Sequence, residues 1–225
     1  MFLGNNWIPR NWLVAEYLLA SNSNDTSGNG NNGTDTSITY SSGSAVFNGS
    51  SSVISLPSVS QLKPTWVFSI SLWVKTTPWA NWAYPTFIQS YSQVSTVAWF
   101  EIMQNPPDHP SKPNCLRFII GKNTGFTAGT DWQEAFSTNA ITDNTWQHIY
   151  CEYNWTTIIV YQNNSAGTSQ NWNQWLAYTA TSYQRIWAAN HSGSDFWFTN
   201  GNIKKARIYD RALNSTEIAL LYADS

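Results

Sequence analysis

From residue 13 onward, short runs of β-branched and aromatic residues alternate with clusters of Asn, Gly, Ser, Thr and Pro. Runs of this kind predict β-strands joined by turns, and many in succession are typical of a sandwich or barrel. No repeat of about 20 to 50 residues is visible, which argues against a propeller or a solenoid. The strand candidates are residues 13–19, 44–47, 52–56, 67–75, 85–91, 96–103, 115–121, 146–153, 156–162, 183–188 and 203–210.

A single segment near the end of the chain has helical spacing. Asn214 can cap a helix with Glu217 three residues later, and Ile218, Leu221 and Tyr222 then recur on one face. We expect a short helix over about 215–222 that closes one end of the sandwich. Residues 150–161 predict a hairpin with its turn near residue 154.

Five segments occur in a characteristic order. They are Leu13–Leu19, the Asn-Gly-rich loop Asn24–Gly33, Ala45–Ile54, Phe68–Lys75 and Ala206–Leu213. In this order the chain resembles laminin-G-like domains of the concanavalin A-like lectin/glucanase superfamily, over roughly residues 12–223. The resemblance implies an all-β fold, a two-sheet antiparallel jelly-roll sandwich over residues 12–225, with residues 1–11 as an N-terminal arm.

Charge and hydropathy exclude several classes of protein. Charged residues make up 11% of the chain, against about 25% in typical soluble domains. The net charge is -2 and the 11 basic residues are scattered, so we expect no nucleic acid partner. The best apolar run, Trp12–Ala20, is split by Glu16 and is too short for a membrane span.

The first residues lack the basic segment of a signal peptide. We therefore expect either that a leader has been removed or that the protein is released by lysis, as virion components are. Both routes place it in an extracellular location or on a virion surface.

Cys115 and Cys151 are too few for a disulfide framework, and we favour two buried thiols over one bridge.

Aromatic residues are abundant, with 14 Trp, 11 Tyr and 10 Phe. Aromatic rings stack on sugar rings while Asn, Gln and Ser bond the hydroxyls. Trp66, Trp73, Trp99, Trp146, Trp155 and Trp187 lie in strand patterns and are assigned to packing. Trp79, Trp82 and Tyr84, together with Trp172 and Trp175, lie in turn-rich sequence, where we expect exposed tryptophans and a ligand-binding platform. A protein–protein contact would use the same enrichment.

The Asn-Gly-rich loop is the candidate metal site. Laminin-G-like domains often hold calcium near such a loop, and Asp25, Asn29, Asn31 and Asp35 could supply the oxygen ligands that calcium takes. Relatives often carry an Asp-Glu pair where this chain has Lys204 and Lys205, and two positive charges there would repel a cation. The alternative is that the loop's glycines serve a tight turn without any ion.

Hydrolytic chemistry has little support in the sequence. Glucanases of this superfamily use a Glu-x-Asp-x-x-Glu strand, and the five glutamates of this chain are far apart. His148 is interpreted as a strand residue with a bonded ring rather than a base. We expect a non-catalytic lectin-like module that binds a glycan or cell-surface polysaccharide, or mediates adhesion. The alternative is a decoration protein that binds capsid or other virion subunits, with a glycoside hydrolase as a distant third.

Overall fold

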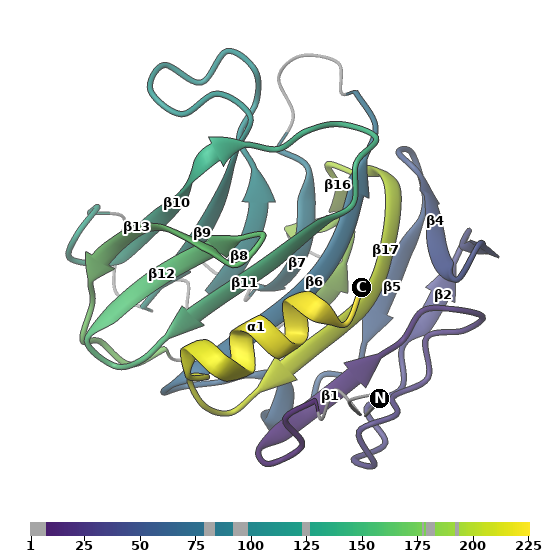
Figure 1. The fold of residues 1–225 in the computed structure, drawn as a ribbon, viewed down its shortest axis with the longest axis horizontal. Coiled ribbons are helices and arrows are strands. Elements are labelled where there is room, and N and C mark those ends of the chain that lie inside the picture. The colour runs from purple at the N-terminus through teal and green to yellow at the C-terminus, as the bar shows by residue number, and fades with distance from the viewer. Residues whose placement is uncertain are drawn as a thin grey trace, which may run out of the picture.

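The computed structural model describes residues 8–78, 84–91, 99–122, 127–176, 178, 183–191 and 194–225. Two antiparallel sheets stack face to face (Figure 1). The eight-stranded sheet has the order β13 (Ser165–Asn171), β12 (Thr157–Gln162), β11 (Gln147–Tyr153), β6 (Phe68–Thr76), β17 (Asn200–Tyr209), β4 (Ser44–Asn48) and β3 (Thr39–Ser41), with β1 (Leu13–Tyr17) also paired to β17. The seven-stranded sheet has the order β10 (Trp132–Ala140), β9 (Cys115–Gly121), β8 (Trp99–Gln104), β7 (Thr86–Tyr91), β14 (Tyr183–Ile186), β5 (Val53–Leu56) and β2 (Thr34–Thr36).

Smaller elements complete the structure. The hairpin β15 (Ala189–His191) and β16 (Ser194–Phe196) forms a separate small sheet, and a 3-10 turn, η1 (Ser60–Leu62), precedes β6. The one α-helix in the described part of the chain is α1 (Ser215–Ala223). The jelly-roll prediction is therefore confirmed, and each expected strand segment contains a strand. The turn near Asn154 is also confirmed, because its side-chain oxygen accepts hydrogen bonds from the backbone of Thr156 and Thr157, at 3.1 and 2.9 Å.

The core lies between the two sheets and follows the period of two that a strand imposes. In β6, Phe68, Ile70, Leu72 and Val74 all point inward and are fully buried. The residues between them face the outer side of the eight-stranded sheet, where Trp73 is also buried. An outward-facing tryptophan that is only 5% exposed must be covered by another element.

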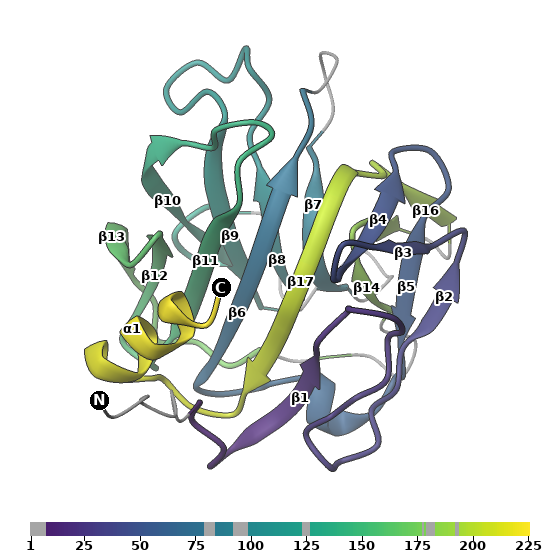
Figure 2. The same ribbon diagram turned by 45° about the vertical axis from the view of Figure 1, so that its right-hand side comes forward.

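Helix α1 provides that cover. Ile218 and Leu221 pack with Tyr150 and Tyr209 on the outer face of the eight-stranded sheet, and the Trp73 indole N–H donates to the carbonyl of Leu221 at 3.3 Å. The helix therefore lies across this face rather than closing one end, which corrects our expectation (Figure 2). Apolar side chains on the outside of the sheet determine where it packs.

The helix begins as predicted. Asn214 and Glu217 form a capping box, in which each side chain accepts a hydrogen bond from the other residue's backbone at 3.0 Å. A second contact anchors the same turn, because Arg211 makes an ion pair with Glu217 at 2.6 Å.

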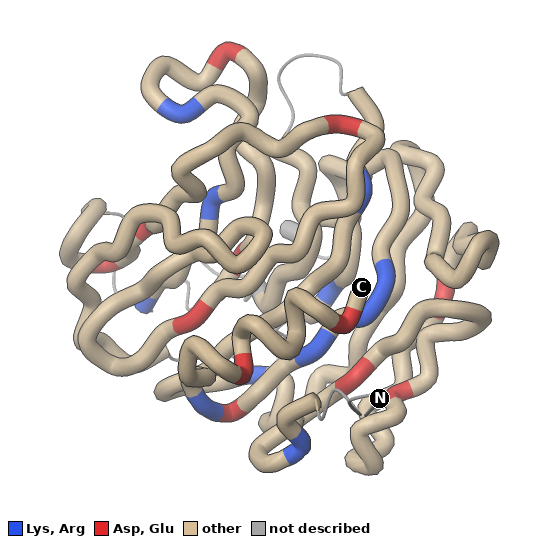
Figure 3. Tube along the Cα trace, viewed as in Figure 1, with Lys and Arg blue, Asp and Glu red and all other residues tan. Residues whose placement is uncertain are grey.

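Charged residues are sparse, and several basic ones lie on β17 beside the C-terminal segment (Figure 3). Arg207 donates to Glu16 at 2.8 Å and to Asp224 at 2.6 Å, and the side chains of Arg207 and Glu16 are each 2% exposed. Burial alone would raise the pKa of Glu16, but hydrogen bonds from Arg207 and Thr26 outweigh it and hold this pKa below its ordinary value. This network joins β1, β17 and the segment after α1. Arg10 adds a contact to Glu16 at 2.7 Å.

Both cysteines are free and buried, as predicted. Cys115 lies in the seven-stranded sheet and Cys151 in the eight-stranded sheet.

Within the described residues, no helix has the length and apolar character needed to cross a membrane. The expected N-terminal arm falls largely outside the described residues, which begin at residue 8.

Candidate functional site

The structure separates the aromatic residues that we predicted to form a ligand platform. Trp79 and Trp82 lie outside the described residues. Trp175 is 50% exposed, as expected, whereas Trp172 is 3% exposed and belongs to the core, which corrects our prediction. Trp172 is buried because its backbone N–H bonds to the carbonyl of Thr156 at 2.9 Å, and this directs the segment back onto the sandwich. Tyr84 is half-buried elsewhere, against Trp197 at 5.3 Å.

The tryptophans that we assigned to packing also divide. Trp73 and Trp187 are buried, Trp146 and Trp155 are half-buried, the Trp99 side chain is outside the description, and Trp66 is exposed. The 48% exposure of Trp66 contradicts its assignment to the core. Trp12, immediately before β1, is more exposed still, at 67%.

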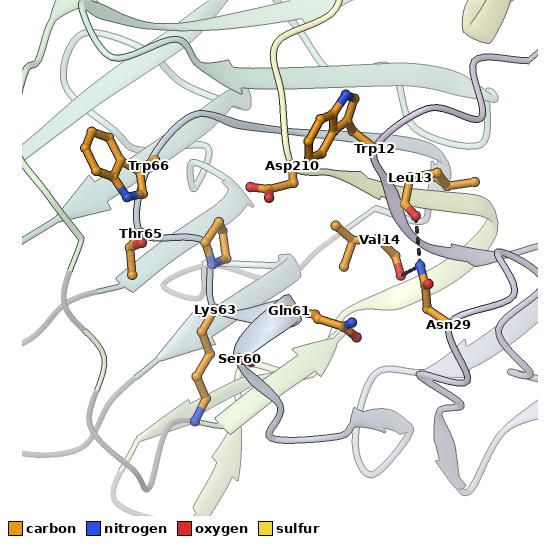
Figure 4. Close-up of a pocket in the computed structure, with 11 residues that line it drawn as sticks. Trp12, Leu13, Val14, Asn29, Ser60, Gln61, Lys63, Thr65, Trp66 and Asp210 are labelled. Carbon is orange, nitrogen blue, oxygen red and sulfur yellow. Dashed lines mark hydrogen bonds between the residues drawn. The ribbon is translucent and has the colours of Figure 1, made fainter.

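Trp12 and Trp66 line the same pocket, which has a volume of about 320 Å³. The remaining lining residues are Leu13, Val14, Asn29, Ser60, Gln61, Lys63, Pro64, Thr65 and Asp210. We call this the Trp12–Trp66 pocket. Figure 4 shows Asp210 between the two indoles, at the end of β17, and the Lys63 side chain extending away from it.

Tight backbone contacts hold Trp12 at the pocket. The N–H of Leu13 bonds to the carbonyl of Arg10 at 3.3 Å, which closes a turn, and Trp12 has a left-handed φ of 63°. The Trp12 carbonyl then accepts a hydrogen bond from the backbone of Asp210 at 2.9 Å. One bond thus fixes the aromatic wall and the acidic residue relative to each other.

Asp210 is the most unusual group in the pocket. Its carboxylate accepts no hydrogen bond and makes no ion pair with any residue that the structure describes. Burial raises its pKa above the ordinary value, and burial is the sole cause. The residue as a whole is exposed, so solvent reaches the carboxylate, and a ligand that donates hydrogen bonds can replace that solvent.

Neutral polar groups also line the pocket. Ser60, Gln61 and Thr65 are exposed at the rim. The amide of Asn29 is held on the opposite wall, where it donates to the carbonyls of Leu13 and Val14 at 2.9 and 3.0 Å (Figure 4). Aromatic walls, a carboxylate acceptor and a hydroxyl- and amide-rich rim form a surface that suits a polyhydroxylated ring.

The expected calcium ligands serve other bonds. Asp25 organises its loop from within, because its two carboxylate oxygens accept hydrogen bonds from the backbone of Glu16, Ser27 and Asn31 and from the Ser27 hydroxyl, at 2.9–3.0 Å. These bonds lower the pKa of Asp25 below its ordinary value, although its partial burial alone would raise it. The oxygens that would bind the ion are already in use.

The other three candidates do not complete a site. Asn29 and Asn31 both direct their amide N–H groups to the Val14 carbonyl, and Asp35 accepts a hydrogen bond from Tyr40 at 2.7 Å. Within the described residues, no group of three His, Cys, Asp or Glu side chains could hold a metal ion. As placed, the four side chains do not fit a calcium ion, and the calcium expected from the sequence is left to a chelation experiment.

The two lysines that replace the acidic pair point elsewhere. Lys205 bonds to Asp224 at 2.9 Å, and Lys204 lies over the ring of Trp146 at 4.4 Å. Neither ammonium group forms a salt bridge to Asp25 in place of an ion. Backbone N–H groups have that role instead.

Two titratable groups with strongly shifted pKa values lie away from the pocket. Burial raises the pKa of Glu101 to about 7, and its carboxylate accepts a hydrogen bond from Thr86 at 2.7 Å. At 3% exposure it lacks the access that a general acid needs. Burial lowers the pKa of His148 to about 3, and its ring bonds to Ser71 at 2.9 Å. The prediction that His148 is a bonded strand residue is confirmed.

Sequence reasoning missed three of the pocket's central residues. Trp12 and Trp66 each flank a predicted strand, so neither belonged to an obvious loop cluster. Asp210 lies within the Arg-Ile-Tyr-Asp-Arg segment, which we used as a marker of the fold. The turn-forming Pro64 beside Trp66 was the available signal that this ring leaves the strand.

A laminin-G family model, described as the Concanavalin A-like lectin/glucanases superfamily, matches residues 48–219, which is more than half of the chain. No curated protein matches the chain significantly by sequence. Among solved structures, domain 4 of AbnA, an extracellular GH43 arabinanase from Geobacillus stearothermophilus, in complex with arabinotriose, is similar with a TM-score of 0.70 and 23% identity. The match covers 93% of this chain and 98% of that domain.

Two structures of a botulinum neurotoxin DC binding domain are also similar, each at 15% identity. The complex with SialylT has a TM-score of 0.66 and the complex with rat synaptotagmin II has a TM-score of 0.69. Each match covers 96% of this chain and 52% of the toxin domain, so the chain spans about half the length of those domains. At these identities the likeness establishes the fold alone.

Proposed function

Because the chain belongs to the concanavalin A-like lectin/glucanase superfamily, we propose that it is a non-catalytic carbohydrate-binding module whose Trp12–Trp66 pocket holds a sugar. The observation that carries this proposal is the Asp210 carboxylate, which lies between two exposed indoles and has no partner among the residues that the structure describes. A sugar ring offers both of the complements that this arrangement lacks. Its hydroxyls donate to the carboxylate, and its C–H face packs on the aromatic walls.

The comparisons support this class of ligand. The arabinanase domain was solved with arabinotriose and one toxin domain with SialylT, so the fold serves glycan binding in other proteins. One fold can host many functions, because function depends on the residues of the site. The Trp12–Trp66 pocket is therefore the basis for assigning a carbohydrate ligand to this chain.

Binding is tested by screening the purified protein on an array of neutral and acidic glycans that includes arabinotriose. We expect the protein to bind neutral glycans on the array. Asp210→Ala should weaken binding roughly 10- to 100-fold, because a hydrogen bond to a charged group contributes about 1.5–3 kcal/mol. Trp12→Ala should weaken it as well.

A matched control is available on helix α1. Tyr222 is also an exposed aromatic residue, at 39%, but stacks on Trp73 and does not line the pocket. Tyr222→Ala should leave glycan binding unchanged. If the array shows no binding by the wild-type protein, or if Asp210→Ala binds like the wild type, this pocket is not a sugar site.

The second candidate is a structural or decoration role on a virus particle, in which aromatic surface binds neighbouring protein subunits. The neurotoxin domain solved with rat synaptotagmin II supports protein binding as a use of this fold. Display outside a cell or on a virion stays a prediction. A higher mass in light scattering, lost on mutation of Trp66 but not of Asp210, would favour subunit contacts over glycan.

A further inference from the structure

A second exposed aromatic surface adjoins the pocket. The rings of Trp66 and Trp175 meet edge to face with centroids 3.5 Å apart, and Trp155 packs against both at 5.0 and 5.4 Å. We call these three residues the tryptophan ledge. Trp66 belongs to the pocket and to the ledge, so the two surfaces are continuous at its ring.

The backbone fixes the ledge in place. Leu176 donates to the carbonyl of Thr65 at 3.2 Å, which ties the segment that carries Trp175 to the one that carries Trp66. The Tyr153 hydroxyl donates to the carbonyl of Gln174 at 2.9 Å on the other side. A rigid apolar surface binds with little loss of conformational entropy.

Two of the three rings of the ledge are exposed, so the ledge is a candidate binding surface rather than part of the core. Trp66 is 48% exposed and Trp175 is 50% exposed, although they are in direct contact. Scattered exposed apolar residues are ordinary, whereas a contiguous exposed patch indicates an interaction site. Both rings would bury more surface if a ligand covered them.

The size of the pocket bears on the length of the ligand. Its volume of about 320 Å³ lies near the bottom of the roughly 300–1,000 Å³ range of ligand pockets. An oligosaccharide whose first units fill this volume and whose chain extends past Trp66 would contact Trp175 next. The ledge therefore lies where the following units of the chain would pass.

Charge indicates what kind of chain fits. Among the described residues that line the pocket, Asp210 and Lys63 carry charge. Asp210 lies between the indoles, and the Lys63 ammonium group is directed away from it (Figure 4). A carboxylate or sulfate on the ligand would face Asp210 without a compensating cation, so a neutral chain is favoured.

We propose that the Trp12–Trp66 pocket and the tryptophan ledge form one path for a neutral linear oligosaccharide, with one end in the pocket and later units stacked on Trp175. This inference rests on the proposed function. The extended path implies that affinity increases with the length of the oligosaccharide and that Trp175 contacts only the longer oligosaccharides.

The test uses neutral linear oligosaccharides graded from disaccharide to hexasaccharide, with arabinan, xylan, glucan and mannan backbones, and sialylated and uronic acid oligosaccharides as acidic probes. Affinities are measured by titration calorimetry for the wild type, Trp175→Ala, Trp175→Phe and Trp12→Ala. We expect Trp175→Ala to lose roughly 3- to 10-fold on the longest chain, in line with one aromatic contact, and nothing on the disaccharide. Trp175→Phe should restore most of the loss, and Trp12→Ala should weaken every length.

The outcomes separate this inference from the proposed function. No binding of any probe by the wild type overturns both. Binding that is independent of chain length, or equally affected by Trp175→Ala at every length, overturns the extended path while the pocket stands. Preference for the acidic probes overturns the assignment of a neutral chain. Melting curves of the variants confirm folding, since Trp175 is half exposed.

Discussion

Replacing Arg207 by Met removes the cation at the centre of the network that joins β1, β17 and the segment after α1. The Met side chain has a similar length and fills much of the same space. Glu16 is left at 2% exposure with the Arg10 contact and the Thr26 hydroxyl. Breaking a buried ion pair by removing one partner costs about 3–5 kcal/mol in the free energy of unfolding. We expect a loss in this range near neutral pH.

The pH dependence gives this prediction its sharpest form. In the wild type, the pKa of Glu16 is below its ordinary value of 4.5, so the carboxylate contributes stability above that pH and loses it as the pH falls through the folded-state pKa. Burial is the largest influence on Glu16 and remains when Arg207 is removed. The pKa of Glu16 therefore rises in the variant, and protonation relieves the buried charge as the solution becomes acidic.

Urea denaturation of the wild type, Arg207→Met and the double variant Glu16→Gln/Arg207→Met would measure this, near neutral pH and at about pH 4. The cost of Arg207→Met should be smaller at the acidic pH. The double variant should be more stable than the single one near neutral pH, because no buried charge remains. An equal cost at both pH values, or a double variant less stable than Arg207→Met, would refute the buried-charge account.

Three further predictions concern separate parts of the molecule. Glu101→Gln should stabilise the protein by up to about 3 kcal/mol at alkaline pH. Burial raises the folded-state pKa of Glu101 from 4.5 to about 7, so the wild type loses stability as the pH rises from the lower to the higher value, at about 1.36 kcal/mol per pH unit. Parallel stability profiles of the two proteins from acid to alkaline pH would contradict this. Gly201→Ala should lower the free energy of unfolding by about 1–3 kcal/mol. Gly201 has a φ of 142°, and an added Cβ would collide with the Lys75 carbonyl. An unchanged midpoint of urea denaturation would exclude this strain. EDTA should leave the melting temperature unchanged, because backbone N–H groups already occupy the Asp25 carboxylate, and a fall in melting temperature would instead indicate a bound calcium ion.

Much of the fold could be predicted because inward-facing apolar residues alternate along the central strands. β6 shows this most clearly, with Phe68, Ile70, Leu72 and Val74 buried on one face. β13 was missed because its sequence, Ser165–Asn171, is polar and lies at a sheet edge, where one side is solvated. β10 was missed for a related reason, since its last three residues are exposed.

The candidate site was harder to predict because exposure depends on contacts that are distant in sequence. Trp172 and Trp66 both lie near turn-forming residues, yet one is 3% exposed and the other 48%. The difference arises because the backbone of Trp172 bonds to Thr156, whereas the segment around Trp66 is held by Leu176 with its ring outward. Asp210 became a candidate only when its carboxylate proved to have no partner among the described residues.

The left-handed backbone at Trp12 has a consequence for laboratory evolution. A bulky side chain at a φ of 63° costs about 1–2 kcal/mol, and at 67% exposure the indole regains little of this by burial. A screen for heat resistance alone should therefore enrich Gly or Asn at position 12, since both tolerate this conformation. Such variants would unfold at higher temperature and lack one wall of the pocket. A library of variants of this domain should therefore be selected for ligand binding as well as for thermostability. Selection for thermostability alone would enrich proteins whose pocket has lost its function.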